Sequence, residues 1–402
     1  MYRRLSFEVG GKLHGSSDCD GEGLGTQQDK KGWLMNRRDF LKNCLVVGST
    51  LASPWLLPRA EANFVPKRIL VLGGTLFLGP ALVDALLASG HTLTLFNRGV
   101  TNPELFPHVP KLRGFRSADA GDQDLSALSH RHFDVIVDVW PNDPDVVASA
   151  ANFLRDRAAH YLFVSSVGAY DRNEFAKMSI VEDAPLQPWD SSARLYNRNK
   201  AESERRLHQI IGEKLTIVRP GPIAGHRDGG GDLLVWLLRA QDGGEHIAPG
   251  DGNDPVEFVD VKDVAGFLAM AINSSLYGTF NLAGRSLSFR EFLEKCKVAT
   301  NSNADFVWIP QQFLHEHGLE SNRVLHTFIG NFPVWVPERD YQGLYRVSSE
   351  KAFGAGWVTR SFNETAFDCL NDFYSEEFNE NLSPMSIETE REVLDAWKRR
   401  KS

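Results

Sequence analysis

The sequence predicts an α/β fold: a doubly wound parallel sheet followed by a smaller C-terminal lobe. From Lys67 onward, short apolar runs rich in β-branched and aromatic residues alternate with helical stretches. Strands that are apolar throughout, without alternation, are typical of a parallel sheet that is buried on both faces. The chain has 402 residues, of which 42% are hydrophobic and 24% charged, and this composition is ordinary for a globular enzyme.

Five strands and four helices are expected in the first part of the sheet domain. The expected strands are 68–72, 92–96, 133–139, 161–164 and 215–218, and the expected helices are 80–88, 122–128, 145–158 and 193–211. Beyond His226 the alternation loosens into a mixed region that contains Trp236, Trp308, Trp335 and Trp357. We interpret this region as a smaller lobe over the carboxyl edge of the sheet, with one return to the sheet near 279–282. The expected domains are therefore 1–62, 63–225 and 226–402.

Residues 35–62 have the three parts of a secretory signal. Arg37 and Arg38 give a basic start, an apolar run covers 44–57, and small residues follow at 60–62. The apolar run is shorter than the about 20 residues that a membrane span needs. Paired arginines followed by Phe-Leu-Lys resemble a twin-arginine signal, which exports folded proteins. We expect a periplasmic protein that uses the twin-arginine translocation machinery. A basic leader helix on a cytoplasmic protein is the alternative, and Met35 is a second candidate start.

Charge and cysteine content exclude several classes of protein. The net charge is −8 for the whole chain and −10 after Ala62. This sign argues against a sequence-independent nucleic-acid binder, which needs a basic surface. The two cysteines after the leader, Cys296 and Cys369, have no metal-ligand spacing and are too few for a disulfide framework. We therefore expect no metal site, and the pairing of the two cysteines stays open.

The stretch KRILVLGGTLFLG, at 67–79, has the order strand, glycine turn, helix. Gly73 lets the chain reverse, and Gly79 lets the helix pack on the strand. The amino end of the helix then meets the pyrophosphate of a dinucleotide. Leu76 occupies the place of the usual middle glycine, and Gly74 can compensate. A turn that binds nothing is the alternative. The expected cofactor contacts are Gly73, Gly74, Thr75, Phe77, Leu78 and Gly79.

The second strand ends in Asn97 and Arg98, where an acid would otherwise bind the adenine ribose. Asn97 can hydrogen bond a ribose hydroxyl, and Arg98 can pair with a 2′-phosphate or stack on adenine. Asp119 is either an adenine contact or a helix-capping acid. The expected cofactor is therefore NAD or NADP, with tolerance of NADP.

Tyr196 and Lys200 are four residues apart on an expected helix, which places them on one face. A phenol with an ordinary pKa near 10 is a poor base at neutral pH. A neighbouring ammonium group stabilises the phenolate and lowers the pKa. Ser166, at the end of the strand 161–164, can orient the substrate oxygen. Tyr196, Lys200 and Ser166 are the candidate catalytic residues, and a solvated helix face is the alternative for the Tyr–Lys pair.

At this point the sequence resembles the extended short-chain dehydrogenase/reductase superfamily, in its NAD-dependent epimerase/dehydratase branch. The resemblance covers about 67–282 and rests on GGTLFLG, SSVGAY, YNRNK, RPGPIAG and GDGNDPVEFVDVKDVA in that order. It implies a Rossmann fold, places the serine role on Ser166, and assigns nicotinamide contacts to Pro220 and Ile223. The GGTxFLG variant is also similar to a subgroup that includes chloroplast stem-loop RNA-binding proteins.

Export and catalysis together suggest one function. A folded protein can leave the cytoplasm with its nucleotide bound, and an enzyme outside needs to keep that nucleotide. A retained cofactor favours a redox-neutral reaction, such as epimerisation or elimination on a carbohydrate-like small molecule. The expectation is an epimerase/dehydratase-type oxidoreductase. The alternative is a binding protein on the same fold, with RNA or a partner protein as ligand. A homodimer stays open.

Overall fold

A computed structural model describes residues 65–119, 123–139, 143–177, 179–229, 231–319, 331–375 and 385–401. The leader and signal expected at 1–62 lie outside these residues. Within the described ranges, no helix combines the length and the apolar character that crossing a membrane requires.

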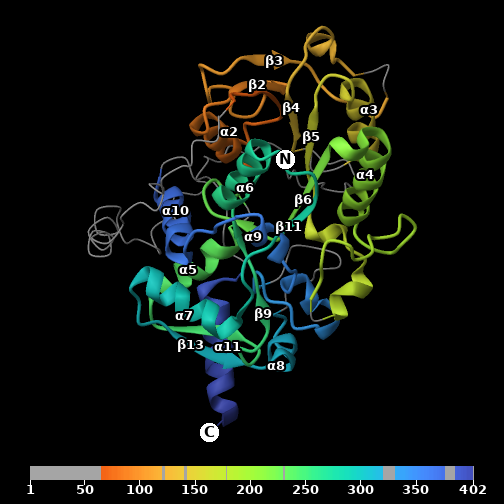
Figure 1. Ribbon diagram of the computed structural model, residues 1–402. Helices are drawn as coiled ribbons and strands as arrows, with labels where there is room; N and C mark the ends of the chain where they lie inside the picture. Colours follow the sequence, from red (N-terminus) through yellow and green to blue (C-terminus); the bar gives the residue numbers. More distant parts are fainter. Residues whose placement is uncertain are drawn as a thin grey trace, which may run out of the picture. The chain divides into compact units, whose positions relative to one another are not determined.

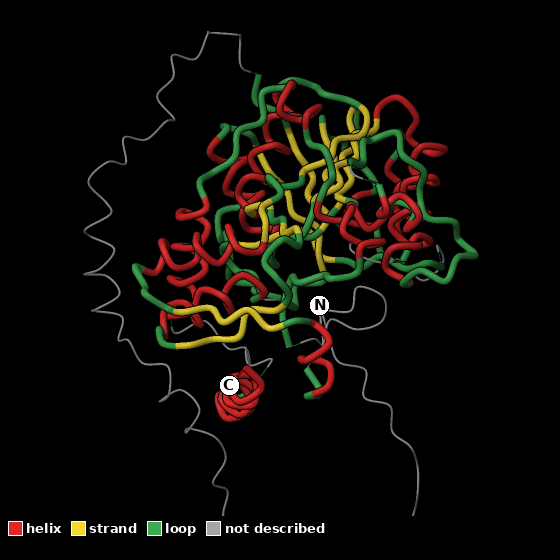
Figure 2. Tube along the Cα trace, turned by 90° about the horizontal axis from the view of Figure 1, so that it is seen from below, coloured by secondary structure: helices red, strands yellow, loops and turns green. Residues whose placement is uncertain are grey.

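A seven-stranded parallel sheet lies between two layers of helices (Figures 1 and 2). Its order is β11-β6-β5-β4-β1-β2-β3, and every adjacent pair is parallel. The predicted doubly wound sheet is therefore confirmed. The chain changes direction between β1 and β4, and sheets of this type bind ligands at the carboxyl ends of the strands beside such a switch point. The strands are β1 (Arg68–Leu72), β2 (Thr92–Asn97), β3 (Lys111–Arg113), β4 (Val135–Asp138), β5 (His160–Val164), β6 (Leu215–Pro220) and β11 (Gly278–Leu282).

Four helices cover the two faces of this sheet. On one face α2 (Leu78–Ala88) packs against α6 (Val261–Asn273), and on the other α3 (Pro144–Leu154) packs against α4 (Leu195–Ile211). β1 contributes to both layers: Ile69 and Val71 belong to the α2–α6 core, whereas Leu70 and Leu72 belong to the opposite one. This double burial explains why the strands read as continuous apolar runs.

Two expected details of the sheet domain differ from the structure. The helix expected over 122–128 is only a 3-10 turn, η3 (Ser126–Leu128), within the described part of that range. The expected α-helix cannot begin before Ser126, because the backbone of Asp124 pairs with that of Phe115 through two hydrogen bonds of 3.0 and 3.2 Å. The short edge strand β3 was not expected, since Lys-Leu-Arg is not an apolar run. The expected return strand near 279–282 is β11, beside β6.

The elements given at the end of this paragraph surround an aromatic centre, and we call them the C-terminal lobe. Trp236 is fully buried, lies 5.2 Å (ring centroids) from Phe289, and donates through Nε1 to the carbonyl of Pro333 at 2.9 Å. β8 pairs with β13 in parallel. The elements are α5 (Asp232–Asp242), β8 (Glu245–Pro249), β9 (Pro255–Val256), β12 (Leu287–Ser288), α7 (Phe289–Thr300), β13 (Asp305–Ile309), α8 (Gln311–Glu316), η7 (Arg339–Tyr345), α10 (Phe362–Tyr374) and α11 (Ile387–Lys401).

Trp357 does not belong to this lobe, although the sequence grouped it with the other tryptophans. It follows α9 (Glu350–Gly354) and lies in the α2–α6 core, 6.1 Å from Phe267 between ring centroids. Its Nε1 donates to the carbonyl of Asp263 at 3.0 Å. The segment 350–357 therefore returns to the sheet domain, as β11 does.

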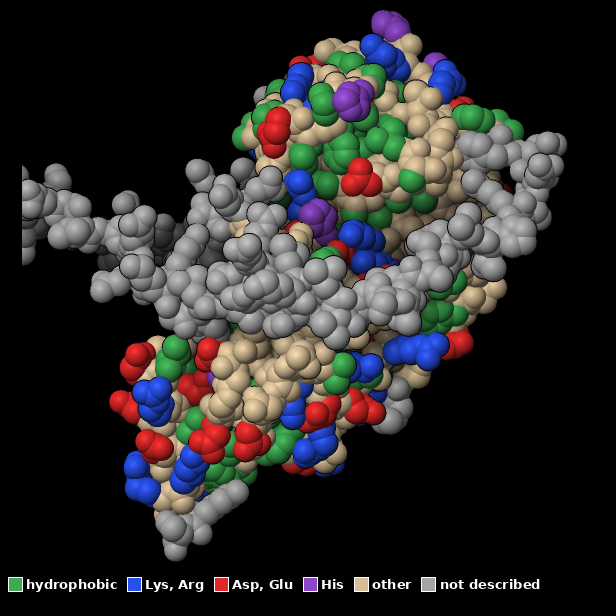
Figure 3. Space-filling model, turned by 90° about the vertical axis from the view of Figure 1, so that its left-hand side faces the viewer, with side chains coloured by type: hydrophobic (Ala, Val, Ile, Leu, Met, Phe, Trp, Pro, Cys, Tyr) green, Lys and Arg blue, Asp and Glu red, His purple; other side chains and the backbone are tan. Residues whose placement is uncertain are grey.

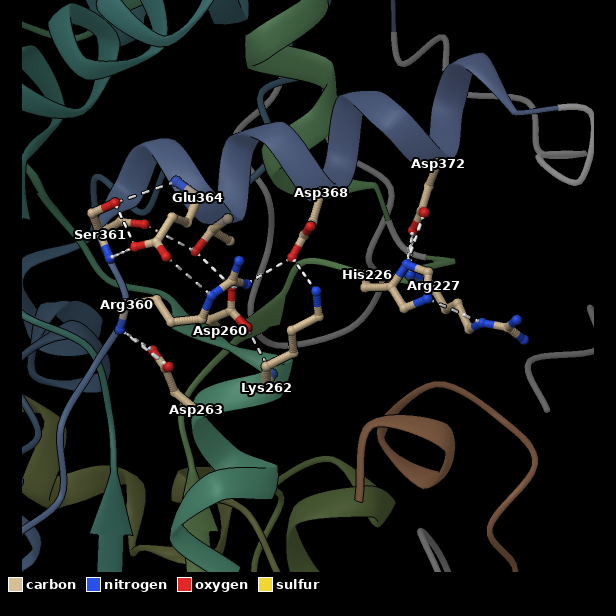
Figure 4. A network of polar contacts seen from close by, with 11 residues as sticks. His226, Arg227, Asp260, Lys262, Asp263, Arg360, Ser361, Glu364, Asp368 and Asp372 are labelled. Carbon is tan, nitrogen blue, oxygen red and sulfur yellow. Dashed lines mark hydrogen bonds and ion pairs between the residues drawn. The ribbon is translucent and has the colours of Figure 1, made fainter. Parts of the chain in front are cut away.

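A polar network along α10 holds a small parallel ribbon at the edge of the sheet domain (Figure 4). The ribbon consists of β7 (Ile223–Ala224) and β10 (Val259–Asp260). Arg360 bridges Asp260 at 2.8 Å and Asp368 at 2.7 Å, and Asp372 accepts from Nδ1 of His226 at 2.8 Å. Because Asp260 also caps α6, α10 fixes the ribbon that carries Ile223.

Candidate active site

The glycine turn after β1 has a backbone that only glycine adopts without strain. Gly73 has φ 117° and Gly74 has φ 95°. The amide of Gly73 donates to the carbonyl of Phe96 at 2.9 Å, which ties the turn to the end of β2. Thr75 is buried, and its carbonyl accepts from Nδ2 of Asn102 at 2.8 Å. The turn is therefore held at both ends by its neighbours.

Gly79 lets the first turn of α2 lie directly on this backbone. A Cβ at position 79 would lie 2.6 Å from the carbonyl carbon of Gly74 and 2.8 Å from its Cα. Phe77, the N-cap, makes no side-chain capping bond, and the first turn of α2 has no acidic residue. The amide groups at this helix end are thus not capped by a side chain, and this arrangement fits the pyrophosphate of a dinucleotide. Leu76 is 48% exposed, so its side chain does not fill the space beneath the turn.

Asn97 binds the turn itself. Its Nδ2 donates to the carbonyl of Gly73 at 3.1 Å, and its Oδ1 accepts from the amide of Gly99 at 3.0 Å. Oδ1 also accepts from Arg113 at 2.8 Å. A ribose hydroxyl would have to share these atoms. The structure therefore gives Asn97 a role in shaping the turn that sequence reasoning did not include.

Arg98 and Arg113 are both exposed beside the end of β2. Sequence reasoning missed Arg113, whose guanidinium group lies where a side chain on Gly99 would be. The sequence signal that could have indicated this contact was Gly99, because a glycine leaves room for the side chain of another residue. Two guanidinium groups and no acid at the end of β2 favour tolerance of a 2′-phosphate. Asp119 is exposed, and its amide bonds to Oγ of Ser117 at 3.2 Å.

The three candidate catalytic residues converge at the carboxyl end of β5. Lys200 is 2% exposed, and its Nζ donates to the carbonyl of Val164 at 2.7 Å. The same Nζ lies 5.8 Å from the ring centroid of Tyr196. Ser166 lies two residues after Val164 in the chain, and its Oγ accepts a hydrogen bond from the amide of Gly168 at 3.1 Å. Burial lowers the pKa of Lys200 to about 7, although the carboxylates of Asp138 and Glu204 act in the opposite direction.

The adjacent serine has a different environment. Ser165 is 2% exposed and its hydroxyl donates to Oε1 of Glu204. Glu204 is in turn bound by the guanidinium group of Arg219 at 2.6 Å. Ser166 is only half-buried. The hydroxyl of Ser165 is thus committed to a buried ion pair, and Ser166 remains the candidate for the serine role.

A second buried ion pair was not expected from the sequence. Arg116 binds Asp138 through two hydrogen bonds of 2.7 and 3.0 Å, and the hydroxyl of Tyr161 donates to Asp138 at 2.9 Å. Asp138 ends β4 beside the switch point and is opposite Phe163 in the register with β5. The sequence signal that could have indicated this ion pair was the charged residue at the end of the apolar run VIVD. This carboxylate favours the charged form of Lys200.

The two expected nicotinamide contacts lie on the neighbouring strand end. Pro220 is the last residue of β6 and is buried. Ile223 is half-buried in β7 and packs against the same apolar cluster as Phe77. Within the described ranges, His, Cys, Asp and Glu side chains form no group of three or more that could hold a metal ion, and Cys296 and Cys369 are free and buried.

Residues 69–283 match the model of the NAD dependent epimerase/dehydratase family, which is more than half of the chain. The chain belongs to this family. The family assignment confirms the superfamily resemblance in its coarse form and the dinucleotide cofactor. It does not specify a substrate.

Solved structures with the same fold include proteins in complex with UDP or UDP-glucose. The Bordetella bronchiseptica enzyme WbmG in complex with NAD and UDP is 17% identical, with a TM-score of 0.57, over 80% of this chain and 100% of that one. The UDP-glucose 4-epimerase of Thermotoga maritima with UDP-glucose is 18% identical, with a TM-score of 0.56, over 76% of this chain and 98% of that one. At these identities the likeness shows the fold alone.

One relative in sequence carries a different kind of name. The chloroplast stem-loop binding protein of 41 kDa b from Arabidopsis thaliana is 28% identical over 253 residues. The match covers 58% of this chain and 63% of that protein, so this chain spans less than two thirds of its relative's length.

Replacing Gly79 tests the cofactor turn. Gly79→Ala should remove most of the bound nucleotide, because the new methyl group overlaps the backbone of Gly74 and displaces the turn. Gly266→Ala is the matched control: this exposed glycine of α6 has open space around it, and alanine should stabilise the helix by about 0.5–1 kcal/mol. Nucleotide released from each purified variant is quantified by chromatography. Equal nucleotide in Gly79→Ala and wild type would place the cofactor elsewhere.

Proposed function

We propose that this protein is a cofactor-retaining, NAD(P)-dependent epimerase or dehydratase that acts on a hydroxylated, sugar-like substrate. The observation that carries the proposal is the buried ammonium group of Lys200. It is fixed by the carbonyl of Val164 and lies beside the ring of Tyr196, at the strand end that also presents Ser166. The glycine turn that fits a dinucleotide lies at the same carboxyl edge of the sheet, after β1.

The residues of the chain divide the work of binding and proton transfer. The turn from Gly73 to Gly79 and the amino end of α2 hold the pyrophosphate, and Pro220 and Ile223 border the nicotinamide. When bound, the cofactor supplies a hydride acceptor and donor. Tyr196 removes the proton from a substrate hydroxyl group, and Lys200 stabilises the resulting phenolate. Ser166 orients the substrate oxygen through its hydroxyl group.

The class of substrate is supported by the family and by the neighbouring folds. A redox-neutral reaction returns the hydride to the same substrate, so the enzyme needs no second substrate to reset its cofactor. The Thermotoga maritima protein is a UDP-glucose 4-epimerase, and WbmG was solved with UDP. These proteins support a carbohydrate or sugar-nucleotide substrate, carried over here as part of the proposal.

A binding protein on the same fold is the second candidate, favoured by the name of the Arabidopsis relative. Charge argues against its RNA form. The net charge after Ala62 is −10. On the face in Figure 3, the coloured Lys and Arg side chains are interspersed with Asp and Glu and do not gather into one basic surface. An RNA ligand would need such a surface for its phosphates.

Tyr196→Phe separates the enzyme from the binding protein. The change keeps the ring but removes the hydroxyl that takes the proton, so the hydride step should slow by about 10²–10⁴-fold. Bound nucleotide should stay. The measurement is nicotinamide absorbance during incubation with a panel of sugars and sugar nucleotides.

Tyr277→Phe is the matched control, because Tyr277 is exposed and its ring centroid lies 4.5 Å from that of His160, at the opposite end of β5. It should react as wild type does. A wild-type cofactor that no compound reduces, together with RNA or a partner protein that binds wild type and Tyr196→Phe equally well, would contradict the enzyme and favour the binding protein.

Export to the periplasm is part of the proposal, since it explains why the cofactor has to be retained. The double change Arg37→Lys and Arg38→Lys should leave an unprocessed precursor in the cytoplasm, because the receptor reads paired guanidinium groups. Cell fractionation and immunoblotting measure this. Normal periplasmic recovery of the double variant would rule out the twin-arginine route, and a chain that starts at Met35 should export as the full chain does.

A further inference from the structure

Glu257 buries a carboxyl group that lacks a partner. It lies between β9 and β10, its side chain is 1% exposed, and Oε1 has no hydrogen bond within the described part of the chain. Two other buried carboxylates are paired: Glu204 binds Arg219, and Glu390 binds Arg239 and His246. A buried polar group without a partner destabilises the folded state. Its retention therefore needs a reason other than stability.

Glu257 lies beside the end of β6, next to the segment proposed to border the nicotinamide. Oε1 lies 3.2 Å from the point that a Cβ on Gly221 would occupy. Gly221 follows Pro220 at the end of β6, in the segment proposed to border the nicotinamide. Ala283, directly after β11, lies 3.6 Å from the same point. Glu257 thus lies beside the carboxyl ends of two adjacent parallel strands, and a side chain at position 221 would crowd its carboxyl group.

Two other acidic groups face the same region. Tyr345, the last residue of η7, is buried, and the carboxyl groups of Glu257 and Asp232 both act on its hydroxyl. Burial raises the pKa of Glu257 well above its ordinary value. Burial, with Asp228 nearby, raises the pKa of Asp232 to about 7. Among the described residues, no lysine or arginine acts on the carboxyl groups of Glu257 and Asp232 or on the hydroxyl group of Tyr345.

The segment that carries Tyr345 also touches the loop that carries the catalytic serine. Gly343 packs on the backbone of Phe175, where a side chain would overlap the Phe175 carbonyl. Arg172 donates to the hydroxyl of Tyr341, and its guanidinium group lies 5.3 Å from the centroid of that ring. Both Phe175 and Arg172 follow Ser166 on the chain past β5. The segment 339–345, which carries Tyr345, therefore packs against the chain that follows Ser166.

We propose that Glu257, with Asp232 and Tyr345, binds uncharged hydroxyl groups of the substrate and selects for a neutral ring at this position. The proposal rests on the proposed function and names the substrate class of the same site. A carboxyl group both donates and accepts hydrogen bonds when protonated, as a sugar hydroxyl does. Because no described lysine or arginine acts on these three groups, a phosphate or carboxylate here would lack a compensating charge from the described part of the chain. The phosphates of a sugar nucleotide, if present, lie elsewhere.

Stability gives a first test that needs no substrate. Glu257→Leu should raise the midpoint of thermal unfolding of the full chain, because it removes a buried carboxyl group without a partner. Glu390→Gln is the matched control, since it breaks a buried ion pair with Arg239 and should lower the midpoint. A fall for Glu257→Leu comparable to that of Glu390→Gln would show that Glu257 has a structural role and would overturn the proposal.

Binding gives the second test, by calorimetric titration of the full chain with D-glucose, UDP-glucose and D-glucuronate. Glucose or UDP-glucose should bind wild type, and glucuronate should bind at least about tenfold more weakly than glucose. Glu257→Leu should weaken the binding of the neutral ring by about tenfold, and Glu257→Gln by less, because the amide still hydrogen bonds. Equal affinity in wild type and Glu257→Leu would overturn the proposal, as would a wild type that binds none of the three probes.

The two proposals fail in different ways. Binding that depends on Glu257 without any change in nicotinamide absorbance would uphold the hydroxyl site and contradict the proposed reaction. Reduction of the cofactor that is unchanged in Glu257→Leu would uphold the reaction and overturn the hydroxyl site.

Discussion

The burial of the Lys200 ammonium group is the constraint on which the site depends. A charged amine that is 2% exposed is costly to hold, and Nζ of Lys200 donates to the neutral carbonyl of Val164. The surrounding structure offsets this cost with charge: Asp138 and Glu204 both favour the protonated amine. Each of these carboxylates is held by an arginine and by a hydroxyl group from β5 or its end. The strand end therefore holds the Lys200 ammonium group between two buried arginine–carboxylate pairs.

Fold and chemistry meet at one edge of the sheet. The order of parallel strands brings the ends of β1, β4, β5, β6 and β11 to the same side, so groups far apart in the sequence become neighbours. The glycine turn contributes amide groups, β4 and β5 contribute the charged network, and β6 and β11 border Glu257. The ribbon of β7 and β10, held by α10, carries Ile223 toward the same apolar cluster as Phe77. No element supplies the site alone.

The sequence predicted the parts of this arrangement that are local. Strands buried on both faces read as apolar runs, and the spacing of Tyr196 and Lys200 follows from helix geometry. The parts it missed are those that depend on tertiary contact. Arg113 reaches Asn97 only after β3 pairs with β2, and three residues with two charges gave no strand signal. Trp357 was grouped with the lobe because nothing in its neighbourhood indicates that 350–357 packs against α6. Likewise, nothing in the sequence around Glu257 indicates that Oε1 of this side chain is buried without a hydrogen-bond partner.

The proposed function requires a dinucleotide that stays bound to the protein without resupply. Mass spectrometry of the small molecules released when the purified protein is gently denatured tests this most directly. We expect about one NAD or NADP per chain, with NADP present if Arg98 and Arg113 bind a 2′-phosphate. A protein that releases no nicotinamide dinucleotide, yet is folded and soluble, would contradict the account.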